Sequence, residues 1–224
     1  MLNEKELSFL AEKGHIVSLV GGGGKTTLLY AMADHCARKG WRVLVTTTTH
    51  IRQPAACYAP DDAALTALWQ AGHYAVIGTP AENGKLTLPP QQLLRRMAQA
   101  DAVFIEADGA KHHPCKVPAA HEPVLLPQSD IVLAVAGLSA LGKPLREVCF
   151  RYETIRPQFL AAAPDVPLLR RLCWRSCLQA RRAAARRWVT GSFTLCSIRL
   201  IRRNCSSRAY KYNSFCVSRA YRAC

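Results

Sequence analysis

The sequence predicts an α/β protein in which helices cover both faces of a mostly parallel sheet, giving three layers. Short apolar segments rich in β-branched residues alternate along the chain with segments of helical periodicity. A run of four glycines joins the first apolar segment to the first helical one. Half of the residues are apolar, which is enough for the sizeable core that such a fold buries.

The glycine run has the features of a phosphate-binding loop. Residues 16–20 form an apolar strand pattern, and Lys25-Thr26-Thr27 follows the glycines where the helical pattern begins. Without Cβ atoms, glycine N–H groups can turn toward a phosphate, and the helix start adds further donors and a positive dipole end. Lys25 would neutralise phosphate charge, and the Thr26 hydroxyl would bind Mg²⁺. An ordinary flexible turn is the alternative, but lysine and threonine directly after glycine favour phosphate binding.

This loop is shorter than the common phosphate-binding loop, because Leu19 stands where that loop has its first glycine. It fits Gly-x-x-Gly-Lys-Thr-Thr over residues 21–27, a form that resembles the loops of Mur-ligase-like ATPases. The predicted nucleotide-binding residues here are Gly21, Gly22, Gly23, Gly24, Lys25, Thr26 and Thr27. The sequence therefore predicts a P-loop NTPase-like domain that binds Mg²⁺ with ATP or GTP. An Asn-Lys-x-Asp motif, which would select guanine, is absent from the sequence.

A helix is expected over residues 26–39, closed by Gly40, and a strand over residues 41–45. Four threonines, residues 46–49, follow that strand. Since ligands of open parallel sheets bind beyond the carboxyl ends of the strands, we expect Thr47 and Thr48 beside the bound nucleotide. Their hydroxyls would complete the Mg²⁺ shell or orient an attacking water. Threonine also favours strands, so a purely structural strand end is the alternative.

The next elements carry no evident chemistry. Residues 61–71 predict a helix with acids in its first turn, and residues 74–77 predict a short strand. Asn83-Gly84 predicts a hairpin turn, and residues 91–100 predict another helix.

A second informative stretch is the apolar strand predicted over residues 102–105, because Glu106 and Asp108 follow it directly. An acid at the carboxyl end of a strand opposite a phosphate loop can hold Mg²⁺. We predict Glu106 and Asp108, with Lys25, as catalytic residues, and both acids with Thr26 as metal ligands. The Gly109 N–H would approach the γ-phosphate. Acids at strand ends are common, but the glycine run favours the functional interpretation.

Residues 111–116 contain two histidines, one cysteine and two lysines. The histidines and the cysteine suggest metal ligands, but they lack a helical or hairpin frame. We favour a basic patch that faces an anionic substrate. Residues 130–137 predict a further core strand.

Several of these motifs together resemble the YqeC-type family of selenium-dependent molybdenum hydroxylase accessory proteins, over about residues 10–160. The resemblance is carried by residues 21–27, 46–49 and 106–109, Lys111, Pro114-x-Lys116, His121-Glu122-Pro123, Gly137 and Leu141-Gly142. It implies a P-loop protein associated with maturation of a selenium-containing molybdenum hydroxylase, with that enzyme or its cofactor-assembly proteins as partners. It implies no defined reaction, so an NTPase or a phosphoryl- or nucleotidyl-transferring enzyme and a non-catalytic nucleotide sensor both stay open.

The net charge of +15 is distributed unevenly. All 15 acidic residues lie at or before Asp165, while residues 170–224 carry many arginines and six of the ten cysteines. We therefore predict a nucleotide-binding domain over residues 1–165 and an aberrant Arg/Cys/Ser-rich tail over residues 166–224. A nucleic-acid-binding extension would explain the arginines, and a zinc module would explain the cysteines.

We favour a third interpretation of the tail, translation out of frame, because it alone explains the acid-free composition, the missing periodicity and the lost family pattern together. The native C-terminal third is then missing, and the tail is expected to be disordered and to add nothing to the fold. An inactive truncated product is one alternative function. A nucleic-acid binder that uses the tail is another, although nucleic acid is not an expected partner.

The N-terminal residues contain acids where a secretory signal would carry only bases, and apolar runs are too short to span a membrane. Cys36, Cys57, Cys115 and Cys149 are scattered without C-x-x-C pairs, as reduced thiols would be. We expect a cytoplasmic protein without a membrane partner.

Overall fold

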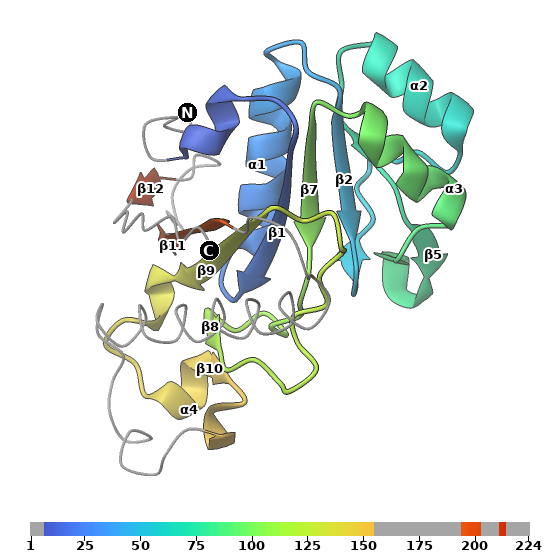
Figure 1. Ribbon diagram of the computed structural model, residues 1–224. Helices are drawn as coiled ribbons and strands as arrows, with labels where there is room; N and C mark the ends of the chain where they lie inside the picture. Colours follow the sequence, from blue (N-terminus) through green and yellow to red (C-terminus); the bar gives the residue numbers. More distant parts are fainter. Residues whose placement is uncertain (1–6, 155–193, 203–210, 214–224) are drawn as a thin grey trace.

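The computed structural model describes residues 7–154, 194–202 and 211–213. Its centre is a seven-stranded sheet with the order β12-β11-β9-β1-β7-β2-β4 (Figure 1). Neighbouring strands pair in parallel except for β11 and β12. The predicted α/β class and the mostly parallel sheet are confirmed.

The elements of the central sheet and the helices are these. The strands are β1 (His15–Gly21), β2 (Val43–Thr47), β4 (Ala75–Val76), β7 (Ala102–Glu106), β9 (Ile131–Gly137), β11 (Thr194–Arg202) and β12 (Lys211–Asn213). The α-helices are α1 (Lys25–Ala37), α2 (Asp62–Gln70), α3 (Gln91–Leu94) and α4 (Leu145–Val148). Turns of 3₁₀ helix cover Ser8–Ala11, Glu82–Gly84, Arg95–Gln99, Leu138–Ala140 and Tyr152–Thr154.

Two smaller sheets complete the described structure. Antiparallel β3 (Ile51–Arg52), β6 (Lys85–Thr87) and β5 (Thr79–Ala81) form one, with β6 in the middle. Asn83 and Gly84 both have positive φ, at 58° and 63°, so the predicted Asn-Gly turn is confirmed between β5 and β6. β8 (Cys115–Lys116) and β10 (Cys149–Phe150) form the other, a short parallel pair.

Helix α1 covers one face of the central sheet, and its bounds agree with the predicted helix. Its apolar side chains Leu28, Leu29, Met32 and Cys36 are fully buried in the same cluster as Val17, Leu19, Val43, Val45, Phe104, Leu133 and Val135 of the strands. The C-cap of α1 is Arg38, and Gly40, the predicted cap, follows two residues later at φ 76° with its N–H donating to the Ala37 oxygen. Alternate side chains of β1 and β7 point to this face, as the two-residue period of a strand requires.

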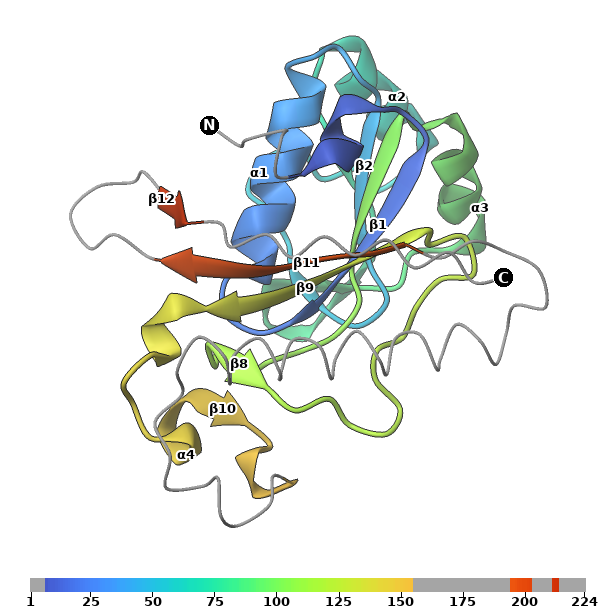
Figure 2. The same ribbon diagram turned by 60° about the vertical axis from the view of Figure 1, so that its left-hand side comes forward.

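The opposite face of the sheet has two coverings (Figures 1 and 2). Helices α2 and α3 pack on Leu44, Val103 and Ile105. Segments around β8, β10 and α4 contribute Cys115, Cys149, Leu145 and Val148 to a cluster with Val20, Val132, Ala134 and Ala136. Helices or connecting segments thus lie on both faces of the sheet in the described residues. Within the described ranges, every helix is too short or too polar to cross a membrane.

The sheet order brings the carboxyl ends of three strands together. Strand β7 lies between β1 and β2, so Glu106 is in register with Leu19 on one side and with Thr47 on the other. The connection from β1 through α1 to β2 therefore passes over one intervening strand. Glu106 consequently lies between the start of the glycine run and the threonine run.

The tail differs from expectation at two segments, because strands β11 and β12 both belong to the central sheet. The backbone of β11 pairs in parallel with β9, with Thr194 in register with Ile131. The expectation that the tail adds nothing to the fold is wrong for this strand, because sheet pairing needs only the backbone N–H and C=O groups of an extended chain. Residues 155–193, 203–210 and 214–224 lie outside the described residues, so the boundary at residue 165 and the out-of-frame interpretation stay predictions.

Candidate functional site

The glycine loop, Gly21–Gly24, is packed tightly between the end of β9 and residues 113–115. Gly21 and Gly23 have φ values of 98° and 69°, which favour glycine. A Cβ on Gly23 would lie 2.4 Å from the Gly137 nitrogen, and one on Gly21 would lie 2.3 Å from the Val135 oxygen. The Gly22 N–H donates to that same Val135 oxygen at 2.9 Å. The loop therefore has one enforced shape and is not an ordinary flexible turn.

The start of α1 offers backbone donors at the end of this loop. Its N-cap is Gly24, at φ 100°, and a side-chain cap bond is absent there. The first N–H groups of an α-helix have no intrahelical acceptor, and the dipole adds positive potential beside them. Gly23, Gly24, Thr26 and Thr27 are partly exposed, so an anion can approach these donors.

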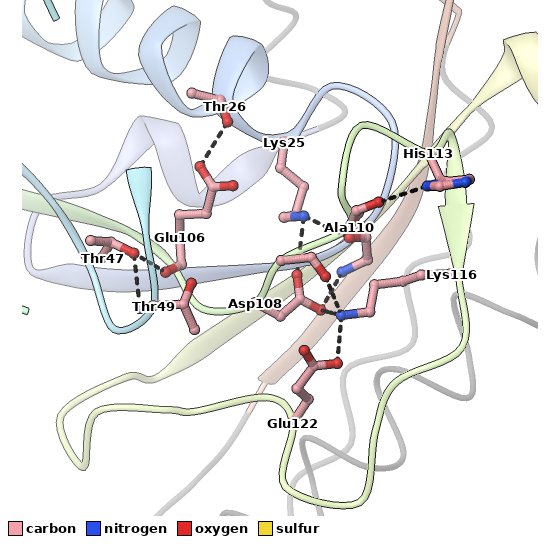
Figure 3. A network of polar contacts seen from close by, with 12 residues as sticks. Lys25, Thr26, Thr47, Thr49, Glu106, Asp108, Ala110, His113, Lys116 and Glu122 are labelled. Atoms are coloured by element: carbon pink, nitrogen blue, oxygen red, sulfur yellow. Dashed lines mark hydrogen bonds and ion pairs between the residues drawn. The ribbon is translucent and has the colours of Figure 1, made fainter. Parts of the chain in front are cut away.

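The Thr26 hydroxyl and the Glu106 carboxylate lie together beside this helix start (Figure 3). The Thr26 hydroxyl donates to Glu106 Oε2 at 2.7 Å. Glu106 ends β7 and is only 7% exposed. Burial raises its pKa above the ordinary 4.5, although the positive charge of Lys25 and the Thr26 hydroxyl oppose the shift. A buried carboxylate whose ionised form is disfavoured gains from a further cation, and Mg²⁺ prefers oxygen ligands of this kind.

The threonine run lies beside Glu106, with Thr47 in register with it, but most of its hydroxyls have protein partners. Thr47 donates to the Glu106 carbonyl oxygen at 2.9 Å and accepts from Thr49 N–H at 3.0 Å. Thr48 donates to the Val124 oxygen at 2.6 Å. Among the described residues, the buried hydroxyl of Thr49 has no hydrogen-bond partner. Thr49 therefore joins the candidate site, and its place in the threonine run was the signal for it.

Asp108 lies apart from the Thr26–Glu106 pair and contacts two lysines (Figure 3). Lys25 Nζ is 3.1 Å from Asp108 Oδ1 and 2.6 Å from the Gly21 oxygen. Asp108 Oδ2 accepts from Gly21 N–H at 2.9 Å and is 3.1 Å from Lys116 Nζ. Asp108 therefore fixes the end of β1 and holds the loop lysine at the same time.

The contacts continue from Lys116 to Glu122 and Arg151. Lys116 Nζ lies 2.6 Å from Glu122 Oε2, and Arg151 Nη1 lies 2.7 Å from the same oxygen. We call Lys25, Asp108, Lys116, Glu122 and Arg151 the ion-pair chain, because positive and negative groups alternate along it. Burial alone would raise the pKa of Glu122, but hydrogen bonds from Lys116, Arg151 and the Ala119 N–H outweigh it and hold the pKa below its ordinary value.

The basic patch expected over residues 111–116 divides into two parts in the structure. Lys116 is 2% exposed and belongs to the ion-pair chain. Lys111 is exposed, with its ammonium 5.2 Å from the Phe150 ring centre, and His113 stacks on that ring. In the part of the chain that the structure describes, His, Cys, Asp and Glu side chains form no group of three that could hold a metal ion.

The remaining predicted residue, Gly109, enters the site through its carbonyl oxygen, which accepts from Lys116 Nζ at 2.6 Å. Glu122 and Arg151 were not among the predicted site residues. Glu122 stood in the quoted His121-Glu122-Pro123 motif, whereas Arg151 carried no local signal. Both become visible only when residues 116, 122 and 151 are brought together in space.

The fold and this site define an α/β protein with a glycine loop at the end of its first strand, facing buried carboxylates and lysines. The family model described as "YqeC protein" matches residues 17–153, a stretch that contains the glycine loop, the Thr26–Glu106 pair and the whole ion-pair chain. The chain belongs to this family.

A curated relative is the "Uncharacterized protein YqeC" of Escherichia coli (strain K12), which is 35% identical over 136 residues. That match covers 57% of this chain and 53% of the relative, so the chain spans about half the length of the relative. A comparison with solved structures gives no match.

Proposed function

We propose that the protein is an accessory protein with a P-loop NTPase-like domain that binds a nucleoside triphosphate together with Mg²⁺. The observation that carries this proposal is the junction of the glycine loop with α1. There, a backbone shape that only glycine fits leads into an uncapped helix start, and the Thr26 hydroxyl lies 2.7 Å from the buried Glu106 carboxylate. Phosphate donors and a pair of hard oxygen ligands are thereby combined within one helical turn.

Each group has a distinct role in the proposed complex. The backbone of Gly23, Gly24, Thr26 and Thr27 surrounds the phosphates, and Lys25 compensates their charge. The predicted phosphate donors Gly21 and Gly22 are buried, and their N–H groups already donate to Asp108 and to the Val135 oxygen. Thr26 and Glu106 hold Mg²⁺, which would neutralise charge on the β- and γ-phosphate oxygens. The partly exposed Thr48, the unpartnered Thr49 hydroxyl and the exposed Gly109 face the same edge of the sheet as candidates for the γ-phosphate. Thr47 acts on Glu106 by holding its carbonyl oxygen.

Asp108 has a different role in this proposal from the metal ligand that the sequence predicts. Its two oxygens contact the Gly21 N–H, Lys25 and Lys116. We therefore assign the acidic metal ligand to Glu106 and treat Asp108 as the partner of the two lysines.

The first test removes the loop lysine. Lys25→Ala is expected to weaken triphosphate binding by about tenfold to a hundredfold, the range for losing a hydrogen bond to a charged group. The matched control is Lys143→Ala, which removes an exposed lysine outside the site and should bind as the wild type does. Calorimetric titration with ATP and with GTP measures both variants and also decides between the two nucleotides. Unchanged affinity in Lys25→Ala would sink the proposal.

A second test concerns the metal. Thr26→Val and Glu106→Gln should lose most of the increase in triphosphate affinity that Mg²⁺ gives, while their affinity in EDTA stays near that of the wild type. A loss of equal size with and without Mg²⁺ would contradict the assignment of these two residues to the metal.

The family resemblance supports a role in maturation of a selenium-dependent molybdenum hydroxylase, with that enzyme or its cofactor-assembly proteins as partners. Reaction class is decided by a single-turnover experiment with the nucleotide bound. Release of phosphate above background indicates an NTPase, and transfer to a second substrate indicates a transferase. Bound nucleotide that stays intact indicates a sensor.

A further inference from the structure

Two buried lysines share Asp108, but only Lys25 belongs to the glycine loop. We propose that Lys116 is the permanent counter-ion of Asp108, and that it thereby allows Lys25 to exchange Asp108 for a phosphate. Lys116 is then a positioning residue for phosphate binding that acts through Asp108. This inference rests on the proposed function, and it adds a residue that the glycine loop motif does not contain.

The contacts of Asp108 give the first step of the argument. Asp108 is 1% exposed and stands between the two ammonium groups, each 3.1 Å away. When Lys25 turns toward a phosphate, a carboxylate with no other cation would be left buried and uncompensated, which is strongly unfavourable. Lys116 prevents this, because its charge stays next to Asp108 Oδ2.

The two lysines differ in how many of their donors are engaged. An ammonium group has three donors. Lys116 Nζ donates hydrogen bonds to the Gly109 oxygen and to Glu122, and it also forms an ion pair with Asp108. Lys25 Nζ donates a hydrogen bond to the Gly21 oxygen, and its contact with Asp108 Oδ1 is an ion pair, since that oxygen has no hydrogen-bond partner among the described residues. Lys116 is therefore held in place, whereas Lys25 keeps a donor for an incoming phosphate.

Glu122 makes the position of Lys116 permanent. Its Oε2 accepts from Lys116 at 2.6 Å, from Arg151 at 2.7 Å and from the Ala119 N–H at 3.1 Å. Lys116 is 2% exposed and its ammonium group lies among the Gly109 oxygen, Asp108 and Glu122, so it does not itself bind the phosphate. Its effect on phosphate binding must pass through Asp108.

The experiment measures binding of Mg²⁺ and inorganic tripolyphosphate, a probe without a base, by calorimetry of the full chain. Lys116→Met should weaken binding at least tenfold, because Asp108 then keeps Lys25. Asp108→Asn should bind at least as tightly as the wild type. In the Asp108→Asn background, adding Lys116→Met should change affinity less than twofold. Equal weakening by Lys116→Met in both backgrounds would overturn the proposal, since a structural role or direct phosphate contact acts without Asp108.

Lys143→Met is the matched control, because Lys143 is an exposed lysine outside the site. It should bind tripolyphosphate as the wild type does. If Lys116→Met alone does not fold, the comparison of Asp108→Asn with the double variant carries the test, since the double variant loses one charge of each sign. Weaker binding by the double variant would count against the proposal.

A second measurement needs no ligand and separates this inference from the proposed function. Urea unfolding of Lys25→Met, Asp108→Asn and their combination gives the interaction between the two residues. Removing the interaction between Lys25 and Asp108 should raise the unfolding equilibrium constant. This increase should be at least threefold larger in the Lys116→Met background than in the background that keeps Lys116. Unchanged interaction overturns the role of Lys116. A wild type that binds no tripolyphosphate overturns the proposed function, and this measurement still decides whether Lys116 relieves Lys25.

Discussion

Glu106 and Glu122 are two buried glutamates of one site, each 7% exposed, yet their pKa values move in opposite directions. Burial raises the pKa of Glu106, whose recorded side-chain hydrogen bond comes from the Thr26 hydroxyl. Glu122 accepts from an ammonium, a guanidinium and a backbone N–H, and its pKa falls. Burial decides the pKa of Glu106, the more deeply buried of the two groups, whereas hydrogen bonds from positively charged donors decide the pKa of Glu122.

The difference separates a carboxylate that is suited to bind a cation, Glu106, from a carboxylate that is suited to stabilise the structure, Glu122. A carboxylate left short of positive charge is prepared for a metal ion, whereas a carboxylate with three donors stabilises its surroundings. In our proposal, Glu106 accordingly belongs to the Mg²⁺ site and Glu122 belongs to the frame that fixes Lys116.

The largest expected loss of stability comes from removing the charge of Glu122, which Lys116 and Arg151 compensate. Glu122→Gln removes the charge between Lys116 and Arg151, so it should lower the free energy of unfolding by about 3–5 kcal/mol, as breaking a buried ion pair does. Urea denaturation measures this. The control Asp34→Asn breaks the exposed pair with Arg38 and should change stability little. A loss no greater in Glu122→Gln than in the control would remove the contrast between the two glutamates.

A smaller loss of stability is expected from a substitution next to Glu106. Thr47→Val removes a buried hydroxyl that donates to the Glu106 carbonyl oxygen and accepts from Thr49 N–H. The Thr49 N–H loses its acceptor, while the Glu106 carbonyl oxygen keeps the Thr48 N–H as a donor, so the change should cost about 1–3 kcal/mol of stability. Chemical denaturation gives the value, and proposed Mg²⁺ binding should weaken as well because Glu106 loses its support. Stability equal to that of the wild type would show that Thr47 does not position Glu106.

The pH dependence of stability should separate the two glutamates by sign. Glu122 has a lowered pKa, so its contribution is present above the ordinary pKa of 4.5 and is lost as pH falls through the folded value. Glu106 has a raised pKa, so its contribution is present below 4.5 and is lost as pH rises through the folded value. Each glutamate changes the slope of the free energy of unfolding against pH by at most about 1.4 kcal/mol per pH unit.

Glu106→Gln should therefore stabilise the metal-free protein at neutral pH, and Glu122→Gln should flatten the loss of stability in acid. Urea midpoints from pH 3 to pH 8, measured in EDTA, test both variants. A metal-free Glu106→Gln that is less stable than the wild type at neutral pH would refute the sign assigned to Glu106.

The smallest effect is expected at Thr48. Its hydroxyl donates to the Val124 oxygen at 2.6 Å, but this bond is solvent-exposed, so water can replace it. Thr48→Ala should cost less than about 1 kcal/mol in urea denaturation, and less than Thr47→Val. A larger loss would mean that the threonine run is supported as a whole and not mainly at Thr47.

The amino-acid sequence by itself determined the local parts of this protein. The glycine run, the helix after it and the strand that ends in Glu106 follow from backbone freedom and apolar periodicity, which neighbouring residues encode. Strand β7, helix α1 and the Asn83-Gly84 turn lie close to where the sequence predicts them. Because parallel strands end on one edge, the meeting of Thr26, Glu106 and the threonine run was predictable too.

Only the tertiary structure decided which charges pair. Glu106 and Asp108 are two residues apart, yet one contacts Thr26 and the other contacts Lys25 and Lys116. Likewise, the sequence predicts Lys116 as part of a basic patch. In the structure, the segments around β8 and β10 bury it beside Glu122 and Arg151. The physical reason is that several carboxylates compete for each lysine, and the outcome depends on distance and burial, which local sequence does not encode.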